Sequence, residues 1–428
     1  MSEALATRIR STVSGFHPTF WVANGMELFE RLAFYGQQIV IAIFLRNRLG
    51  FTEEEAGGLT GIFGGLIYLL PIVGGTLADR FGFRRAFAFA FGILAVGYLL
   101  IGTTGMTALE TFYEGVPLYP VLLVYLVFTA IGGSFIKPSV LGTVAVTSTP
   151  ANKSMGYAIY YWIVNVGALL GPTIAFLVRD SAGIEFVYVV SSISCAAMFV
   201  VNALFYKEVK REGEEHIEPL STKLTNLVTV LRNGRFMVFL LIFSLYWITF
   251  WQEFIIMPYY IVDFIDPDAP FEIIQSWAGA GAIILLQIPV NLVTKRLHTR
   301  TAILVGFAVS GLCWLIVALA PSVPTIVAGV MMFAIGEMTQ APRYYEYISE
   351  LAPPGQQGMY QGYAFLPIAI AFFVGGPFGG HVYATYAKGA TDPSQVWWIV
   401  FGVGMLATIL MGVYNLFLAH GEAAGKPT

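Results

Sequence analysis

Twelve long apolar runs constrain the fold of this 428-residue chain more than any other feature of its sequence. An α-helix needs about 20 apolar residues to cross the hydrocarbon core of a bilayer, and each run is long enough to do so. The runs are continuous rather than alternating between apolar and polar residues, which is typical of spanning helices and not of barrel strands. The sequence therefore predicts twelve spanning helices, at residues 20–45, 54–78, 85–104, 119–145, 155–178, 185–206, 236–262, 271–294, 301–320, 323–349, 358–386 and 395–418.

The composition indicates that lipid is the solvent for most of the chain. Hydrophobic residues make up 57% of it and charged residues 11%, whereas a soluble globular protein carries about 25% charged residues. So few charges exclude a cytosolic enzyme and a secreted disulfide scaffold, and a net charge of −3 leaves no basic surface for nucleic acid. Cys195 and Cys313 lie inside apolar runs and are interpreted as packing residues. No cleavable signal precedes the first run, so we expect the N-terminus to remain in the mature protein.

One long hydrophilic segment, residues 207–235, leaves six predicted spans on each side. We therefore predict an N-terminal six-helix bundle at 1–206, a cytoplasmic linker at 207–235 and a C-terminal six-helix bundle at 236–428. With the N-terminus inside, sixteen of the 23 lysines and arginines fall in inner segments and four in outer loops. This bias predicts that both termini are cytoplasmic. The remaining three, Arg31, Lys137 and Arg343, lie within predicted spans.

The two halves repeat one feature, which indicates an internal duplication. Pro71 of the second span is followed by a short basic loop that contains Arg84 and Arg85, and Pro289 of the eighth span is followed by a basic loop that begins at Lys295. Two six-helix halves joined by a charged linker are typical of transporters whose halves move about a central site.

The first of these loops reads Gly75-Thr-Leu-Ala-Asp79-Arg80-Phe-Gly82-Phe-Arg84-Arg85. So short a loop needs a tight turn, which Gly82 permits because glycine tolerates a positive φ. The spacing of glycine, aspartate and arginine resembles the loop signature of the major facilitator superfamily. The alternative is an ordinary positive-inside loop.

Three charged residues fall within five positions of the first predicted span. Glu27 and Arg31 are four residues apart and share a helix face, and Glu30 lies beside them. Charges in a bilayer are costly, so these side chains must line a bundle interior or a wet cavity. Glu30 and Lys137 of the fourth span both lie about 15 Å from the inner surface at 1.5 Å per residue. We predict one cluster in which a carboxylate holds either a proton or an ion pair; a purely structural ion-pair cluster is the alternative.

These residues also carry a resemblance to the proton-dependent oligopeptide transporter (POT) family. Glu27-x-x-Glu30-Arg31-x-x-Phe34-Tyr35-Gly36 resembles its ExxERFxYYG motif, and Phe135-Ile136-Lys137-Pro138 resembles its FFKPN segment. Other segments similar to the family are Tyr68-x-x-Pro71-x-x-Gly74-Gly75-x-x-Ala78-Asp79-Arg80, Asn165-Val166-Gly167-Ala168 and Gly336-Glu337-x-x-x-x-Pro342. The match is dense through the first five spans and sparse in the second half.

The resemblance implies an all-α membrane protein with the major facilitator fold, which carries small peptides or peptide-like solutes together with protons by alternating access. It implies that protons are coupled by Glu27, Glu30, Lys137, Glu253 and Glu337. It implies that peptide is contacted by Arg31, Tyr35, Tyr68 and Asn165. It also places the fourth and tenth spans opposite each other, from which we predict an inner gate between Lys137 and Glu337.

Several departures from the family pattern bear on the substrate. Phe34 stands where the family has a tyrosine, so a hydroxyl is missing, and Gln38 stands where the family is usually basic. Arg343 could replace that cation, and we expect both Gln38 and Arg343 in the substrate site. The linker is too polar to hold the two extra helices that bacterial members often carry. It stays open whether the substrate is an ordinary di- or tripeptide.

Two other classes compete with a peptide symporter. A superfamily exporter of drugs or amphiphiles would be favoured by a dry pocket in which Arg31 is not engaged. A membrane-embedded enzyme or scramblase is disfavoured because the chain has no His-Glu-x-x-His or Gly-x-Ser-x-Gly motif and no plausible intramembrane metal cluster. The terminal Gly425-Lys426-Pro427-Thr428 also lacks P-loop spacing. We therefore expect no enzyme activity, no catalytic residue, no cofactor or metal, and no nucleotide or nucleic acid. The expected partners are the substrate, protons and the lipid of the cell membrane, with a proton gradient as the energy source.

Other residues have simpler interpretations. Glu253 lies about 27 Å above Arg235, and is either an outer-gate partner or part of a solvated helix end. Arg343 lies near the inner end of its span, where snorkelling competes with function, and His381 is expected to hydrogen-bond within the bundle. Gly57, Gly61 and Gly65 recur at four-residue spacing, which favours close helix packing.

Overall fold

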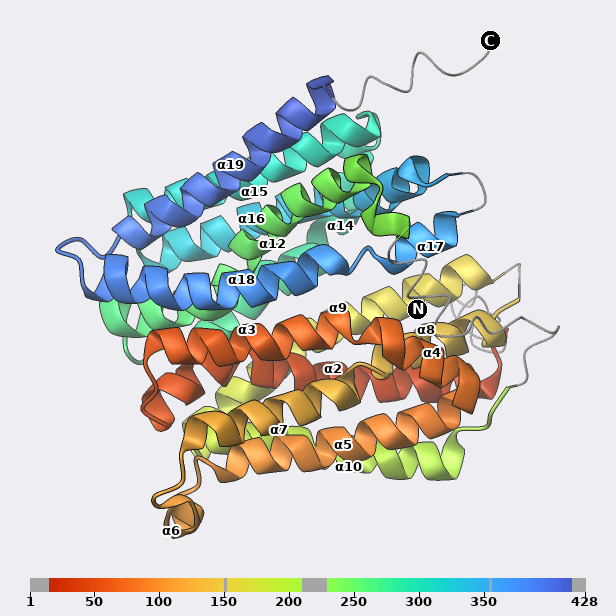
Figure 1. The fold of residues 1–428 in the computed structure, drawn as a ribbon, viewed down its shortest axis with the longest axis horizontal. Coiled ribbons are helices and arrows are strands. Elements are labelled where there is room, and N and C mark those ends of the chain that lie inside the picture. The colour runs from red at the N-terminus through yellow and green to blue at the C-terminus, as the bar shows by residue number, and fades with distance from the viewer. Residues whose placement is uncertain (1–14, 150–151, 210–228, 354–355, 418–428) are drawn as a thin grey trace, which may run out of the picture. The chain divides into compact units, whose positions relative to one another are not determined.

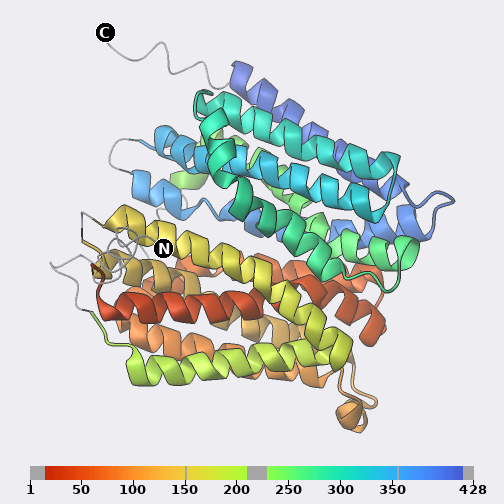
Figure 2. The ribbon, with the colours of Figure 1, turned by 180° about the vertical axis from the view of Figure 1, so that it is seen from behind.

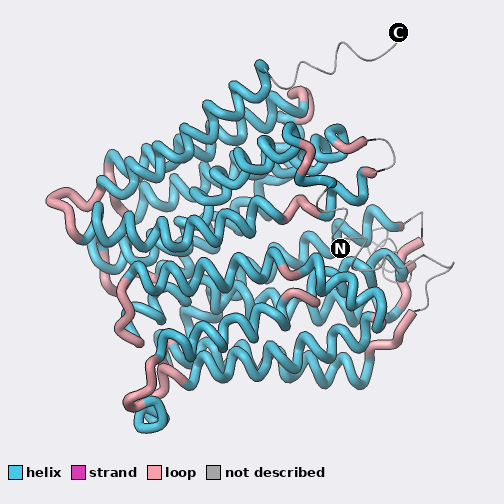
Figure 3. Tube along the Cα trace, in the orientation of Figure 1, coloured by secondary structure: helices cyan, strands magenta, loops and turns pink. Residues whose placement is uncertain are grey.

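A computed structural model describes residues 15–149, 152–209, 229–353 and 356–417, and these residues form helices and loops with no β-strand among them (Figure 3). Eleven of the described helical segments are long and apolar enough to cross a membrane, and the bent pair Glu53–Leu69 and Pro71–Phe81 raises the number to twelve. Each predicted run coincides with one of them, so the twelve predicted spans and the all-α fold class are confirmed. Most of the predicted linker, residues 210–228, lies outside the described residues.

The first six spans can be traced in chain order in Figure 1, where the colour runs from red to yellow-green. They comprise α2 (Pro18–Ile43) with the π-helical turn η1 (Phe44–Arg48), α3 (Glu53–Leu69) with α4 (Pro71–Phe81), α5 (Phe83–Thr103), α7 (Leu118–Gly133) with α8 (Ile136–Thr147), α9 (Lys153–Ser181) and α10 (Glu185–Phe205). Two short elements, η2 (Thr107–Leu109) and α6 (Glu110–Tyr113), lie between α5 and α7.

The last six spans include π-helical turns, two at the ends of spans and one, η4, in the middle of a span. They comprise α12 (Gly234–Tyr260) with η3 (Ile261–Ile265), α13 (Phe271–Ser276) with η4 (Trp277–Gly281) and α14 (Ala282–Thr294), α15 (Thr299–Leu319), α16 (Val323–Leu351), α17 (Gln357–Gly362) with α18 (Leu366–Tyr383) and η5 (Ala384–Lys388), and α19 (Gln395–Phe417).

Two of the spans in the first half are broken where the sequence pattern predicts continuous helices. The second bends by 42° between α3 and α4, because Pro71 lacks the N–H that would continue the helix. The fourth is interrupted between Gly133 and Ile136. Pro138 lies in the first turn of α8, where its missing N–H costs nothing. The break therefore places Lys137 in the first turn of a new helix.

By its contacts the chain divides into two compact units, one formed by residues 1–37 and 70–220 and the other by residues 38–69 and 221–428. In the first unit α5 packs against α7 and α10, and in the second α15 packs against α16 and α19 (Figure 1). Residues 38–69 group with the second unit because α3 packs along α18. The predicted six-helix halves were defined by their position along the chain and not by contacts, so this division stays a prediction.

The contact between α3 and α18 is a close approach of backbones. A Cβ atom placed on Gly61 would lie 2.6 Å from the carbonyl oxygen of Phe372, and one on Gly376 would lie 2.6 Å from the Cα of Gly61. Gly57 approaches the backbone of Gly376 in the same way, and Gly65 faces the ring of Phe373 on the same helix. Small residues allow such packing in lipid, where no hydrophobic force drives helices together. The interpretation of the three glycines as close-packing positions is confirmed.

The short loop between α4 and α5 turns at Gly82, which has a φ of +89° and a ψ of 151°. The predicted tight turn is therefore confirmed. The Glu208 carboxylate, which follows α10, accepts hydrogen bonds from the backbone N–H groups of Phe83 (2.9 Å) and Arg84 (2.8 Å). A carboxylate at this place satisfies two unpaired donors of the first turn of α5 and complements the helix dipole.

Gly82→Ala is expected to destabilise the protein by about 1–3 kcal/mol, because this backbone region is accessible almost only to glycine. Thermal unfolding of the purified protein in detergent measures the effect as a lower midpoint. Gly25→Ala in α2 is the matched control, since a Cβ there meets nothing within 4 Å. Equal midpoints for the two variants would contradict the assigned turn.

Candidate functional site

Three charged side chains of α2 are buried inside the first unit. Glu27 is 0%, Glu30 2% and Arg31 4% exposed. Figure 2 shows α9 and α10 on either side of α2. A Cβ on Gly167 of α9 would collide with the Cβ of Arg31, and Ser191 of α10 donates a hydrogen bond to the carbonyl of Ala33 at 3.2 Å. The charges therefore face the interior of the unit, as their placement in an apolar span predicts.

Arg31 contacts both carboxylates of its helix. Its Nε donates to Oε2 of Glu30 at 2.5 Å, and its Nη2 forms an ion pair with the same oxygen. Nε also lies 3.4 Å from Oε1 of Glu27, one helical turn away. A buried guanidinium that engages two carboxylates offsets part of the cost of removing all three charges from water.

Lys137 joins this cluster from the first turn of α8. It lies within electrostatic reach of Glu27, Glu30 and Arg31, and its side chain is partly accessible. The predicted proximity of Lys137 to the carboxylates of the first span is confirmed, and their depth in the membrane stays a prediction. Two carboxylates and two cations balance in charge, so protonation of one carboxylate leaves a cation without its counter-charge.

Three further side chains that no sequence motif marked lie beside the cluster. Tyr160 of α9 is within reach of Glu27 and Arg31. Tyr98 of α5 and Cys195 of α10, both buried, lie beside Glu30. Cys195 was expected to be a packing residue, because an uncharged residue in an apolar span carries no signal of its neighbours.

The guanidinium of Arg31 also lies over two aromatic rings of its own helix. Its central carbon is 4.8 Å from the ring centroid of Phe34 and 5.9 Å from that of Tyr35. Phe34 thus supplies a π face to the cation, where a tyrosine would add a hydroxyl. Asn165 of α9 is partly exposed, and its amide donates to the carbonyl of Tyr161 at 2.9 Å.

The second unit holds the remaining predicted carboxylates. Glu253 of α12 is only 4% exposed and lies within electrostatic reach of Glu337 of α16. The interpretation of Glu253 as part of a solvated helix end is wrong, because α12 continues to Tyr260 and packing buries the side chain. Tyr246 lies near both carboxylates, and its hydroxyl is 3.3 Å from Ser310 Oγ.

Three residues predicted to contact substrate belong to the second unit, and each has different neighbours. Tyr68 stacks on Phe372 with ring centroids 5.8 Å apart, and Gln38 is fully buried. Arg343 forms a 2.7 Å ion pair with Glu346. The roles of these residues, and those of the first unit, stay predictions. So does the gate between Lys137 and Glu337, which belong to different units.

A group of polar contacts in the second unit joins the ends of distant spans. Arg46 of η1 forms a bidentate ion pair with Asp263 of η3 at 2.6 and 2.7 Å, and Tyr383 donates to Asp263 at 2.6 Å. Glu53, at the start of α3, pairs with Lys388 at 2.9 Å. No pattern in the sequence predicts these pairs. His381 hydrogen-bonds between two spans, as expected: its Nδ1 contacts Glu54 of α3 at 2.8 Å, at an exposed end of α18.

Known proteins support the motif-based resemblance. A family model described as Major Facilitator Superfamily matches residues 26–269. Dipeptide and tripeptide permease B of Photorhabdus asymbiotica is 28% identical over 225 residues, which are 51% of this chain and 43% of the permease. The permease of the same name from Salmonella typhimurium is 29% identical over 229 residues, or 52% and 43% of the two chains. The matched region thus spans less than half the length of these relatives.

A solved structure extends the likeness over the whole fold. The crystal structure of a POT family transporter in complex with 5-aminolevulinic acid covers 94% of this chain and 96% of its own, with a TM-score of 0.72 and 18% identity. At that identity the likeness concerns the fold. Since the family model covers more than half of its length, the chain belongs to the Major Facilitator Superfamily, and its likeness to peptide permeases and a POT family transporter confirms the resemblance drawn from its motifs.

Proposed function

We propose that this protein is a proton-coupled symporter of small peptides or peptide-like solutes that works by alternating access. The observation that carries the proposal is the buried cluster of Glu27, Glu30, Arg31 and Lys137 in the first unit. Intramembrane charges of both signs mark substrate and proton pathways. The relatives named dipeptide and tripeptide permeases support the substrate class.

The cluster suggests how proton and substrate are linked. With both carboxylates ionised, Arg31 is held by Glu30 and Glu27. A proton on one of them weakens that hold, and the guanidinium then binds the carboxylate of a peptide bidentately. Because linkage is reciprocal, the proton favours substrate binding and the substrate favours protonation. Net transport then moves both in the same direction.

We further propose the location, the energy source and the partners of this protein. It is a multi-pass protein of the inner or plasma membrane with both termini cytoplasmic, and it has no enzyme activity. It uses the proton gradient instead of a nucleotide or a cofactor. Its partners are the substrate, protons and lipid. Glu253 and Glu337 form a second carboxylate pair for proton coupling.

The test is an uptake screen in proteoliposomes with di- and tripeptides of different side chains. An inwardly directed proton gradient is expected to raise at least one peptide inside above its outside concentration. A protonophore should abolish this accumulation, and vesicles without protein are the control. A superfamily exporter gives the opposite result, since an inwardly directed proton gradient then drives solute out. Loss of a preloaded amphiphile on imposing that gradient, without peptide accumulation, would refute the symporter.

A further inference from the structure

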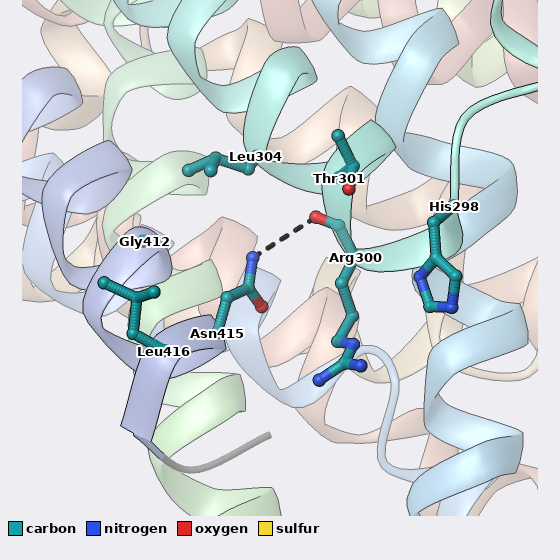
Figure 4. Close-up of a pocket in the computed structure, with 7 residues that line it drawn as sticks. All are labelled: His298, Arg300, Thr301, Leu304, Gly412, Asn415 and Leu416. Atoms are coloured by element: carbon teal, nitrogen blue, oxygen red, sulfur yellow. Dashed lines mark hydrogen bonds between the residues drawn. The ribbon is translucent and has the colours of Figure 1, made fainter. Parts of the chain in front are cut away.

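A crevice between the start of α15 and the end of α19 is separate from the charge cluster. It has a volume of about 450 Å³ and is lined by His298, Arg300, Thr301, Leu304, Gly412, Asn415 and Leu416. Both helices belong to the second unit. The Asn415 amide donates to the carbonyl of Arg300 at 3.3 Å and thereby joins the two helix ends beside the crevice (Figure 4).

One side of the crevice is polar and basic. Figure 4 shows the Arg300 guanidinium and the His298 ring on the side away from the leucines. The segment from Lys295 to Arg300 contains three basic residues and a histidine but no acidic residue. A guanidinium binds a phosphate through two parallel hydrogen bonds, and Thr301 adds a hydroxyl. A net positive edge attracts an anionic group and repels a ligand that carries its own ammonium.

The other side of the crevice is apolar and continues onto a lipid-facing surface. Leu304 and Leu416 form this wall, with Gly412 leaving space between them. Leu416 is 65% exposed, and its neighbours Val413 and Phe417 are also exposed. In a spanning helix such side chains meet acyl chains. The crevice therefore presents a basic edge directly beside an apolar surface.

We propose that this crevice binds an anionic phospholipid, with the headgroup phosphate at Arg300 and His298 and one acyl chain on the Leu304–Leu416 wall. Basic pockets at the membrane-facing ends of helices are known to bind anionic headgroups. The positive-inside count places this end of α15 and α19 in the cytoplasmic leaflet. The proposal is independent of the transported substrate, because it concerns neither the cluster nor its residues.

Native mass spectrometry of the full chain in detergent, titrated with phosphatidylglycerol, tests this site. Arg300→Gln is expected to raise the apparent Kd of the tightest-bound lipid about fivefold or more. Arg296→Gln removes the same charge from an exposed residue outside the crevice and should leave the Kd unchanged. Phosphatidylcholine with the same acyl chains should bind more weakly than phosphatidylglycerol to the wild type. Equal losses in the two arginine variants, or none in either, would overturn the site.

A second pair of variants tests the crevice without changing charge. Gly412→Phe fills the crevice and should abolish binding of the tightest-bound lipid. Gly402→Phe should leave that binding unchanged, because a Cβ added at this exposed position of α19 meets nothing within 4 Å. If Arg300→Gln does not fold, the two glycine variants test the site, and equal lipid binding by both would overturn it. Inorganic phosphate is added as a competitor in a separate arm. Displacement of the lipid by phosphate at equal concentration would show a phosphate site without an acyl component, and would refute lipid binding.

Discussion

Replacing either carboxylate of the α2 cluster by glutamine is expected to abolish peptide accumulation driven by a pH gradient while preserving exchange. Glutamine is neutral at every pH, so Glu27→Gln and Glu30→Gln each mimic the protonated form of the carboxyl group that takes part in coupling. A transporter that exchanges substrate across a vesicle moves no net proton, so it needs no ionised form of that residue. Counterflow and pH-driven uptake are measured side by side in the same vesicles.

The two variants are expected to differ in degree, because Glu30 makes the closer contact with Arg31. The Glu30 carboxylate accepts the 2.5 Å hydrogen bond from Nε, whereas the Glu27 oxygen lies at 3.4 Å. Glu30→Gln should therefore release Arg31 more completely. Glu110→Gln, at an exposed residue of α6 outside the spans, is the control and should keep both activities.

A purely structural cluster predicts a different pattern. Removing one buried charge would leave its partners uncompensated, so folding, exchange and accumulation would be lost together. Full pH-driven uptake in both glutamine variants would mean that neither carboxylate couples protons. Thermal unfolding of each variant separates loss of fold from loss of coupling.

Arg31→Lys is expected to weaken binding of a peptide with a free C-terminus about tenfold or more, while the protein still folds. Lysine keeps the positive charge but cannot form two parallel hydrogen bonds to a carboxylate. It also loses the planar contact with the rings of Phe34 and Tyr35. Binding is measured by the thermal shift of the purified protein as peptide is added.

A C-terminally amidated peptide identifies the group that Arg31 binds. The wild type should bind the free acid more tightly than the amide, and Arg31→Lys should remove most of that difference. Arg85→Lys, at an exposed position of α5, should leave it unchanged. If the lysine variant binds the free acid as tightly as the wild type, Arg31 does not anchor the substrate carboxylate.

Much of the site inside one helix could be predicted from the sequence. The four-residue spacing of Glu27 and Arg31 places them on one face, since helical geometry relates near neighbours directly. Counting residues from the membrane surface also placed Lys137 at the depth of Glu30, because the rise per residue of a helix is constant. The tight turn at Gly82 followed from the short loop and the properties of glycine. These inferences use only local geometry.

The tertiary structure decided which helices meet and where they break. Arg46 and Asp263 are 217 residues apart, and the pair forms because η1 and η3 end beside each other. Tyr98 and Cys195 lie beside Glu30 only through the packing of α5 and α10 on α2. The crevice at Arg300 likewise needs α19 beside α15. A spanning sequence is apolar toward lipid and toward other helices alike, so hydrophobicity does not distinguish the two faces. The pairing of helices is determined by the fit of small residues such as Gly61 and Gly376, and only the folded chain brings these together.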